Sequence, residues 1–203
     1  MRLYASTTSP FVRKVRVVLQ ELGIAEKCEI VPVVSAPHEP DAALGRANPL
    51  NKLPTLELDD GTTLYDSKVI CEYLDAVHGR GQLLPQSGAA RWQVLRTQAL
   101  ADGIVDAGIL VRYESAMRPP ELAWQPWVAG QRLKVTQGLS ELEATIDRQP
   151  PELDLGGIAI ACMMGWLEFR GIEPGLRQAF PRLSAWNDTL QKRPSLAATK
   201  PYS

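Results

Sequence analysis

A cluster of hydroxyl residues before Pro10 is the first place in the chain where the residue types could do chemistry. The segment Thr7-Thr8-Ser9-Pro10 follows a short apolar run, Arg2–Ala5, that is typical of a strand. Proline suits the first position of a helix, so Ser9 is predicted to cap the helix with its hydroxyl near the unpaired N–H groups at the positive end of the helix dipole. Ser9 could serve as a cap alone, or its hydroxyl could also hydrogen-bond a ligand.

A second polar segment precedes a predicted strand and contains Pro54. It reads Asn48-Pro49-Leu50-Asn51-Lys52-Leu53-Pro54-Thr55-Leu56. A trans proline would only begin an edge strand, whereas a cis proline would turn the chain so that the N–H and C=O of Leu53 face a ligand. Both interpretations are open from these residues alone.

Asp66 and Ser67 form a third polar segment, directly before a helical pattern. Aspartate and serine are good helix caps, so capping is the simpler interpretation. A helix start is also a suitable place for an anion, and the Ser67 hydroxyl together with the helix N-terminus could bind a small carboxylate.

Hydrophobic periodicity predicts the elements that position these segments. A strand over residues 2–5, a helix over 10–22 and a strand over 28–34 form a strand-helix-strand unit, which is typical of a parallel crossover. Gly23 stands where the C-terminus of a helix takes a left-handed residue. Pro32 lacks the N–H that a central strand needs, so the second strand is predicted at the edge of a sheet.

A hairpin and a further helix complete the first part of the chain. A short helix is expected over residues 41–47, and Asp59-Asp60-Gly61 predicts the turn between two strands over 54–65. The next helix should run from about residue 67 to 78. Its predicted apolar face comprises Val69, Ile70, Tyr73, Leu74 and Val77.

The second half of the chain has helical patterns throughout. Residues 79–88 contain three glycines and one proline and are predicted to link two domains, over 1–78 and 89–203. Helices are expected over 89–117, 121–148, 154–170 and 181–191. The helix over 154–170 is apolar on nearly every side, so it is predicted to form the core of the second domain. The fold class is therefore α/β plus all-α.

Composition and charge limit the partners of the chain. The 203 residues include 22 Lys and Arg against 23 Asp and Glu, and the net charge of -1 argues against a nucleic-acid partner. The 3 cysteines are not spaced as zinc or dithiol redox sites, so no metal is expected. The longest apolar run, over residues 158–167, is about half of the roughly 20 residues that a membrane span needs. With no secretory pattern at the start, we expect no membrane partner and a cytoplasmic location.

Together these motifs resemble the cytosolic glutathione transferase superfamily. The resemblance rests on Ser9-Pro10-Phe11-x-Arg13-Lys14-x-Arg16, on the Asn48 to Leu56 segment, on Asp66-Ser67-x-x-Ile70-x-x-Tyr73-Leu74 and on the helical second half with Leu155-Gly156-Gly157-Ile158-Ala159-Ile160-Ala161. The chain is similar to bacterial members with an active-site serine. The resemblance implies a thioredoxin-like N-terminal domain that binds glutathione as co-substrate, an all-helical C-terminal domain, and a homodimer.

The resemblance also implies roles for individual residues. Ser9 would hydrogen-bond the sulfur of glutathione, and Leu53 ahead of a cis Pro54 would pair with its cysteinyl backbone. Asp66 and Ser67 would hold the γ-glutamyl end; most relatives carry Glu where this chain has Asp66. Residues expected around these are Lys52 and His38 near the glycyl carboxylate, and Phe11, Asp106, Ile109 and Tyr113 in the electrophile pocket. The alternatives for the hydroxyl at the sulfur are Tyr4, Thr7 and Thr8.

The function that the resemblance implies is a glutathione transferase of the detoxification type, which directs the glutathione thiolate at a small electrophile. Arg112 and Arg118 could favour an anionic electrophile. The alternatives are a non-catalytic glutathione-binding or regulatory protein of the same fold, and a glutathione-dependent isomerase or dehalogenase. No cysteine occupies position 9, so the resemblance does not extend to members that reduce mixed disulfides.

Overall fold

The structure is a computed structural model that describes residues 1–150 and 152–201. Contacts between residues divide the chain into two compact units. The first unit contains Met1–Arg91 together with the described residues 194–201, and the second contains Trp92–Arg193. The sequence predicts one domain over residues 89–203, whereas the contacts place residues 194–201 with the first unit.

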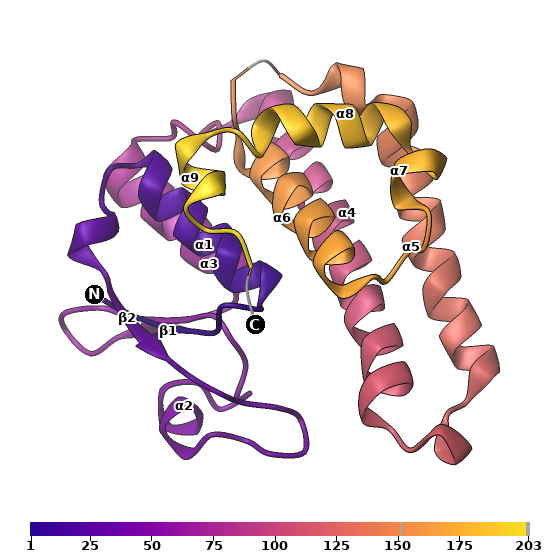
Figure 1. Cartoon of the computed structure of the whole chain (residues 1–203). Coiled ribbons are helices and arrows are strands. Elements are labelled where there is room, and N and C mark those ends of the chain that lie inside the picture. The colour runs from indigo at the N-terminus through magenta and orange to yellow at the C-terminus, as the bar shows by residue number, and fades with distance from the viewer. Residues whose placement is uncertain (151, 202–203) are drawn as a thin grey trace. The chain divides into compact units, whose positions relative to one another are not determined.

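The first unit is built around a four-stranded sheet. Its elements are β1 (Arg2–Ala5), α1 (Pro10–Glu21), η1 (Ala25–Lys27), β2 (Glu29–Pro32), α2 (Ala42–Ala47), β3 (Thr55–Glu57), β4 (Thr63–Leu64), α3 (Ser67–Leu74), η2 (Asp75–Gly79) and, from the end of the chain, α9 (Pro194–Ala197). The strand order is β2-β1-β3-β4, with β1 parallel to β2 and antiparallel to β3. Figure 1 shows α1 and α3 on one face of this sheet and α2 on the other. This thioredoxin-like arrangement confirms the predicted fold, including the edge position of β2.

The buried face of α3 differs from the predicted one. Ile70 is fully buried, but Val69 and Val77 are 48% and 53% exposed, so the prediction was wrong for these two. Ser67 and Cys71 complete the buried stripe instead. They share the helical spacing of Ile70, and their small side chains allow α3 to pack closely, which a search for large apolar residues does not detect.

The end of the chain packs against α1. Arg13 of α1 is buried, and its Nη2 donates to the carbonyl of Leu196 at 3.0 Å. The Ser195 hydroxyl hydrogen-bonds the Glu21 carboxylate. These contacts explain why residues 194–201 belong to the first unit.

The second unit is helical. Its elements are α4 (Gly88–Arg112, which begins in the first unit), η3 (Tyr113–Met117), η4 (Pro120–Leu122), α5 (Gln125–Thr145), η5 (Ile146–Arg148), α6 (Leu155–Arg170), α7 (Leu176–Ala179) and α8 (Pro181–Leu190). α6 is buried along most of its length, as predicted, and Ile158 and Ile160 are fully buried. The predicted helix over 121–148 begins only at Gln125, because Pro126 fits only the first turn of a helix, and Pro120–Leu122 form a separate short turn before it.

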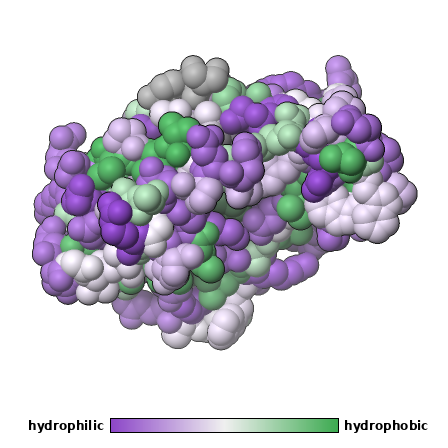
Figure 2. All heavy atoms as spheres, turned by 90° about the horizontal axis from the view of Figure 1, so that it is seen from below, coloured by the Kyte–Doolittle hydropathy of each residue, from purple (hydrophilic) through white to green (hydrophobic). Residues whose placement is uncertain are grey.

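Figure 2 shows one face of the molecule, on which hydrophobic residues are scattered among hydrophilic ones. Among the described residues, no helix has the length and apolar character needed to cross a bilayer. The same residues contain no group of three or more His, Cys, Asp or Glu side chains placed to hold a metal ion.

Candidate functional site

The register of the sheet brings the three polar segments to one edge of the first unit. β1 and β3 run antiparallel with Tyr4 opposite Thr55, so the chain leaves β1 at the end where it enters β3. β3 and β4 are also antiparallel, so the chain leaves β4 at this same end. The segments 6–9, 48–54 and 65–67 therefore meet at the edge of the sheet where β1 ends.

Ser9 starts α1 and uses its side chain as an N-cap, as predicted. Its backbone is extended, with φ -83° and ψ 124°, and its Oγ accepts a hydrogen bond from the Val12 N–H at 3.3 Å. A serine hydroxyl has two acceptor lone pairs and one O–H donor. Because the cap uses only an acceptor, the O–H of Ser9 can still donate to a ligand at the helix start, where the helix dipole favours negative charge.

The other hydroxyl groups near the end of β1 have different surroundings. The Tyr4 side chain is buried, and its hydroxyl donates to Glu57 Oε2 at 2.8 Å. This hydrogen bond to a carboxylate, together with burial, raises the pKa of Tyr4, which makes the phenol a poor partner for a thiolate. Thr8 Oγ1 lies 3.2 Å from Ser6 Oγ, and Thr7 is exposed.

Asn48 and Thr55 hold the loop that carries Pro54, a role that the motif alone does not reveal. The Asn48 side chain is buried, and its Nδ2 donates to the Lys52 carbonyl at 3.1 Å and to Thr55 Oγ1 at 3.0 Å. Its Oδ1 accepts from the Leu50 N–H at 3.0 Å. Thr55 Oγ1 donates to the same Lys52 carbonyl at 3.0 Å. Side chains inside the loop therefore fix its backbone.

Leu53 and Pro54 end this loop, and the peptide bond between them is cis, one of the two conformations left open by the sequence. The Leu53 side chain packs against a buried cluster that contains Tyr4 and Leu44. In the described part of the chain, no hydrogen bond involves the N–H or C=O of Leu53. Its side chain thus anchors the residue, while its main-chain groups are available to an extended peptide laid beside them.

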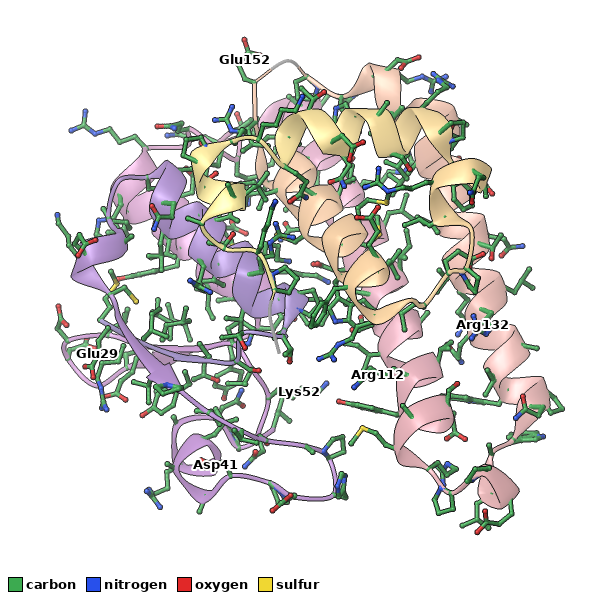
Figure 3. All side chains as sticks on the ribbon, viewed as in Figure 1. Glu29, Asp41, Lys52, Arg112, Arg132 and Glu152 are labelled. Carbon is green, nitrogen blue, oxygen red and sulfur yellow. The ribbon has the colours of Figure 1, made fainter. Side chains whose placement is uncertain are left out.

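Asn51 connects two loops at this edge. Its Oδ1 accepts from Ser35 Oγ at 2.9 Å, and its Nδ2 donates to the Asp41 carbonyl at 2.6 Å. Ser35 and Asp41 flank His38 in the chain, and Figure 3 labels Asp41 and Lys52 in this part of the first unit. The side chains of His38 and Lys52 are exposed, so a part for them in ligand binding stays a prediction.

Asp66 and Ser67 begin α3. Asp66 is the N-cap, and its Oδ1 accepts from the Lys68 N–H at 2.9 Å, which confirms the capping interpretation. The Tyr65–Asp66 peptide bond is cis. Ser67 is the first helical residue and is only 3% exposed. The hydroxyl of Ser67 and the N–H groups of the first turn are the donors that this helix start offers to a carboxylate.

The residues predicted for the electrophile pocket fall in both units. Phe11 is half-buried on α1, and the Lys14 ammonium lies 5.8 Å from its ring centroid. Ile109 and Tyr113 are half-buried near the end of α4, and Asp106 is exposed. Phe11 belongs to the first unit and the other three residues to the second, and the pocket itself stays a prediction.

A cavity of about 340 Å³ lies in the second unit. It is lined by Ile146, Asp147, Gln149, Pro150, Glu152, Leu153, Asp154, Gly157, Trp186, Thr189 and Leu190. None of the site residues predicted from the sequence lines this cavity, so it gives no support to the predicted electrophile pocket.

Comparison with known proteins gives the family. A family model described as glutathione S-transferase, N-terminal domain, matches residues 3–82. The uncharacterized GST-like protein YibF of Escherichia coli K12 is 34% identical over 204 residues, covering 99% of this chain and 98% of that protein.

Two solved structures of a glutathione transferase family member from Pseudomonas fluorescens Pf-5 are also similar. The one with bound glutathione has a TM-score of 0.96 and 45% identity, and covers 100% of this chain and 99% of its own. The one with bound S-(propanoic acid)-glutathione has a TM-score of 0.91 and 42% identity, and covers 99% of both chains. The identities and coverages of these relatives point to the same family as the thioredoxin-like sheet and the helical second unit. The chain therefore belongs to the glutathione S-transferase superfamily.

Proposed function

We propose that this protein is a glutathione transferase that binds glutathione along the edge where β1 ends, with the sulfur at Ser9. The observation that carries the proposal is the meeting of three sets of donors at that edge: the Ser9 hydroxyl, the main chain of Leu53, and the start of α3 at Ser67. The similar structures with bound glutathione and S-(propanoic acid)-glutathione support it.

The binding roles follow from the chemistry of glutathione, a short peptide with two carboxylates. The N–H and C=O of Leu53 pair with the main chain of the cysteinyl residue, as in strand addition. The γ-glutamyl carboxylate accepts from the Ser67 hydroxyl and from the first N–H groups of α3. The Asp66 carboxylate attracts the α-amino group at that end, and Lys52 and His38 face the glycyl carboxylate.

Ser9 acts on the thiol of glutathione without ionising. A free thiol has a pKa of about 8.5, so only a few per cent is thiolate near neutral pH, and the thiolate is the nucleophile. A hydrogen bond to a charged group contributes about 1.5–3 kcal/mol. One pKa unit corresponds to about 1.4 kcal/mol, so the Ser9 hydroxyl and the start of α1 lower the pKa of the bound thiol by roughly one to two units.

The reaction is attack by the thiolate on a small electrophile. Sulfur forms a C–S bond with an electrophilic carbon, and either a leaving group departs with the bonding electron pair or the resulting carbanion takes a proton from water. The S-(propanoic acid)-glutathione held by the 42% identical protein is a thioether of the kind that such a reaction forms. We also propose that the protein is cytoplasmic and acts as a homodimer. Sedimentation velocity would test the dimer.

Two measurements on the purified protein test the function. Titration calorimetry with glutathione measures binding, and mass spectrometry of reactions with a panel of small electrophiles identifies products. We expect saturable binding and thioether products formed faster than without protein. Binding without any product would favour a non-catalytic glutathione-binding protein. Isomerised or dehalogenated products with glutathione regenerated would favour the isomerase or dehalogenase instead.

Substitutions at Ser9 separate its chemical role from its role as a cap. Ser9→Ala removes both the hydroxyl and the cap, whereas Ser9→Gly removes the hydroxyl and costs the cap only a few tenths of a kcal/mol. Both variants should lower kcat/KM roughly 10- to 100-fold, the loss of one hydrogen bond to a charged group. Thr8→Ala is the matched control, and its kcat/KM should stay within about twofold of the wild type.

A further inference from the structure

Two helices of the second unit pack closely and run parallel. A Cβ added to Gly156 of α6 would lie 3.0 Å from the Thr97 side chain of α4. A Cβ added to Gly108 of α4 would lie 2.8 Å from the Trp166 side chain of α6. Earlier positions on α4 thus meet earlier positions on α6 and later positions meet later ones, in agreement with the side-by-side ribbons of Figure 1.

This register places Arg112 and Arg170 at the same end of the two packed helices. Each is the last residue of its helix and follows the contact of Gly108 with Trp166 by four positions. Burial, and next the charge of Arg112, lowers the pKa of Arg170. Within the described residues, the buried Nε of Arg170 has no hydrogen-bond partner, and its guanidinium lies 4.5 Å from the Phe169 ring centroid.

Two carboxylates close to these arginines in the chain pair with other arginines. Glu114 pairs with Arg118 at 2.7 Å, so Arg118, the other arginine that the sequence suggests for an anionic electrophile, has a carboxylate partner. Glu168 pairs with Arg177 at 2.8 Å. Across residues 1–150 and 152–201, no ion pair involves either arginine of the α4–α6 pair. Their two positive charges are therefore not neutralised by this part of the chain.

Cations are stabilised at helix C-termini, which is a purely structural reason for Arg170 at the end of α6, whereas α4 continues beyond Arg112 as the helical turn η3. That reason provides no hydrogen-bond acceptor for the buried Arg170 Nε, and it does not offset the positive charge of Arg112 that helps to lower the pKa of Arg170. Arg132, labelled on α5 in Figure 3, is a further cation, and its Nη1 donates to the Ile172 carbonyl at 2.7 Å. A bound anion would offset this positive charge and provide an acceptor for these donors.

Arg112 also shares a helix face with two residues predicted for the electrophile pocket. Arg112 follows Ile109 by three positions, and Tyr113 follows Ile109 by four. This spacing puts all three residues on one side of the helix. The planar fork of a guanidinium matches a carboxylate in geometry and charge. We propose that Arg112 and Arg170 bind the carboxylate of the electrophile, so that the enzyme prefers small carboxylic acids to neutral compounds. This inference rests on the proposed transferase function.

2-Bromopropanoate and 2-bromopropanamide form a matched pair of probes that differ in the charge beside the reacting carbon. In both, the thiolate sulfur forms a C–S bond with carbon 2, and bromide leaves with the electron pair of the C–Br bond. The thiol proton goes to solvent. Each kcat/KM is divided by the rate constant of the uncatalysed reaction with glutathione, which removes the difference in intrinsic reactivity. We expect the normalised value for the acid to be at least about tenfold above that for the amide.

Arg112→Met and Arg170→Met test the two side chains, because methionine removes the charge and keeps an apolar chain in place. Each variant should lower the normalised kcat/KM for the acid about tenfold or more, mainly through KM, and leave the value for the amide within about twofold. The control is Arg96→Met, an exposed arginine of α4 paired with Glu141, which should change neither value. Equal use of acid and amide by the wild type, or equal loss of both in the two variants, would overturn the proposal.

Saturation-transfer difference NMR with propanoate and propanamide separates this proposal from the transferase function, since it needs no turnover. Propanoate binding that Arg112→Met abolishes supports the arginine site even if neither bromo compound reacts, and in that case the transferase proposal fails alone. Conjugation of both bromo compounds at equal normalised rates, with no arginine-dependent propanoate signal, overturns the arginine site and leaves the transferase function standing.

Discussion

The two units differ in whether their polar side chains have partners within the protein. At the sheet edge of the first unit, Asn48 and Thr55 use their hydrogen-bonding groups to hold one loop, and the groups left for a ligand are main-chain atoms and short hydroxyls. At the end of α4 and α6 in the second unit, the guanidinium groups of Arg112 and Arg170 have no acid that holds them within the described chain.

This difference indicates that binding of glutathione and choice of the electrophile depend on different properties of the protein. A site made of main-chain groups depends on backbone shape, so loss of an internal hydrogen bond should weaken both stability and binding of glutathione. A site made of charged side chains on two packed helices depends on charge, so its substitutions should change the choice of electrophile and leave the fold largely intact. The following experiments are ordered from the largest expected effect to the smallest.

Asn48→Ala should have the largest effect, because it breaks three hydrogen bonds and leaves the Lys52 carbonyl and the Thr55 hydroxyl with fewer partners in a buried place. We expect the free energy of unfolding to fall by about 2–4 kcal/mol. Glutathione binding should weaken as well, because the loop that presents Leu53 is no longer fixed. Urea denaturation and titration calorimetry measure the two effects.

Asn187→Ala is the matched control in the second unit. Asn187 is as buried as Asn48, each being 1% exposed, and its Oδ1 accepts from Gln191 Nε2 at 2.9 Å. This variant should also unfold more easily but bind glutathione with unchanged affinity. If the two variants lost affinity equally, the weakening would reflect general destabilisation and the special role of the Asn48 loop would be wrong.

Ser67→Ala comes next, because it removes one hydroxyl from the proposed contact with the γ-glutamyl carboxylate. We expect the Kd of glutathione to rise roughly tenfold, as for a lost hydrogen bond to a charged group, with little change in stability. The comparison is Ser184→Ala in the second unit, where the buried Ser184 Oγ has no partner among the described residues. Calorimetry should show no change for Ser184→Ala; a similar loss in both variants would count against the carboxylate contact.

Asp154→Asn should have the smallest effect and the opposite sign. Burial raises the pKa of the Asp154 carboxyl, against the hydrogen bonds from the N–H groups of Gly157 and Gly156. The folded state therefore holds the proton more tightly than the unfolded state, and stability falls as the pH rises through the pKa of the folded protein. Asparagine keeps the cap oxygen without the charge, so the unfolding free energy near neutral pH should rise by less than about 1 kcal/mol.

Thermal melts from acidic to neutral pH check the effect of Asp154→Asn. We expect the variant and the wild type to converge at acidic pH, where Asp154 is protonated, and to separate toward neutral pH. A variant less stable than the wild type near neutral pH would mean that the interaction of the Asp154 charge with the start of α6 outweighs its burial.

The elements that form the sheet edge could be predicted because their residues have few conformational choices. Pro32 indicates an edge strand, Asp59-Asp60-Gly61 a tight turn and Ser9-Pro10 a helix start, and the structure contains all three. The buried position of Asn48 could not be predicted, because Asn48 and Asn51 look alike in sequence and differ only in what folds around them.

Which ends of α4 and α6 meet in the second unit is harder to predict from the sequence. A helical pattern predicts that α4 and α6 exist but does not determine which turns meet, since several faces of a long helix are apolar. Gly108 and Gly156 permit the close approach, yet in sequence they look like weak points of a helix. Arg170 therefore cannot be related to Arg112 until the fold sets the register of α4 against α6.

The most direct test of the central claim is the pKa of the glutathione thiol on the protein. Ultraviolet absorbance of the thiolate is followed as the pH rises, with glutathione bound to the wild type and to Ser9→Gly, which keeps the helix cap nearly intact. We expect the bound thiol of the wild type to titrate roughly one to two units below the free thiol, and that of Ser9→Gly to titrate near the free value. Equal pKa values in the two proteins would contradict the role of the Ser9 hydroxyl.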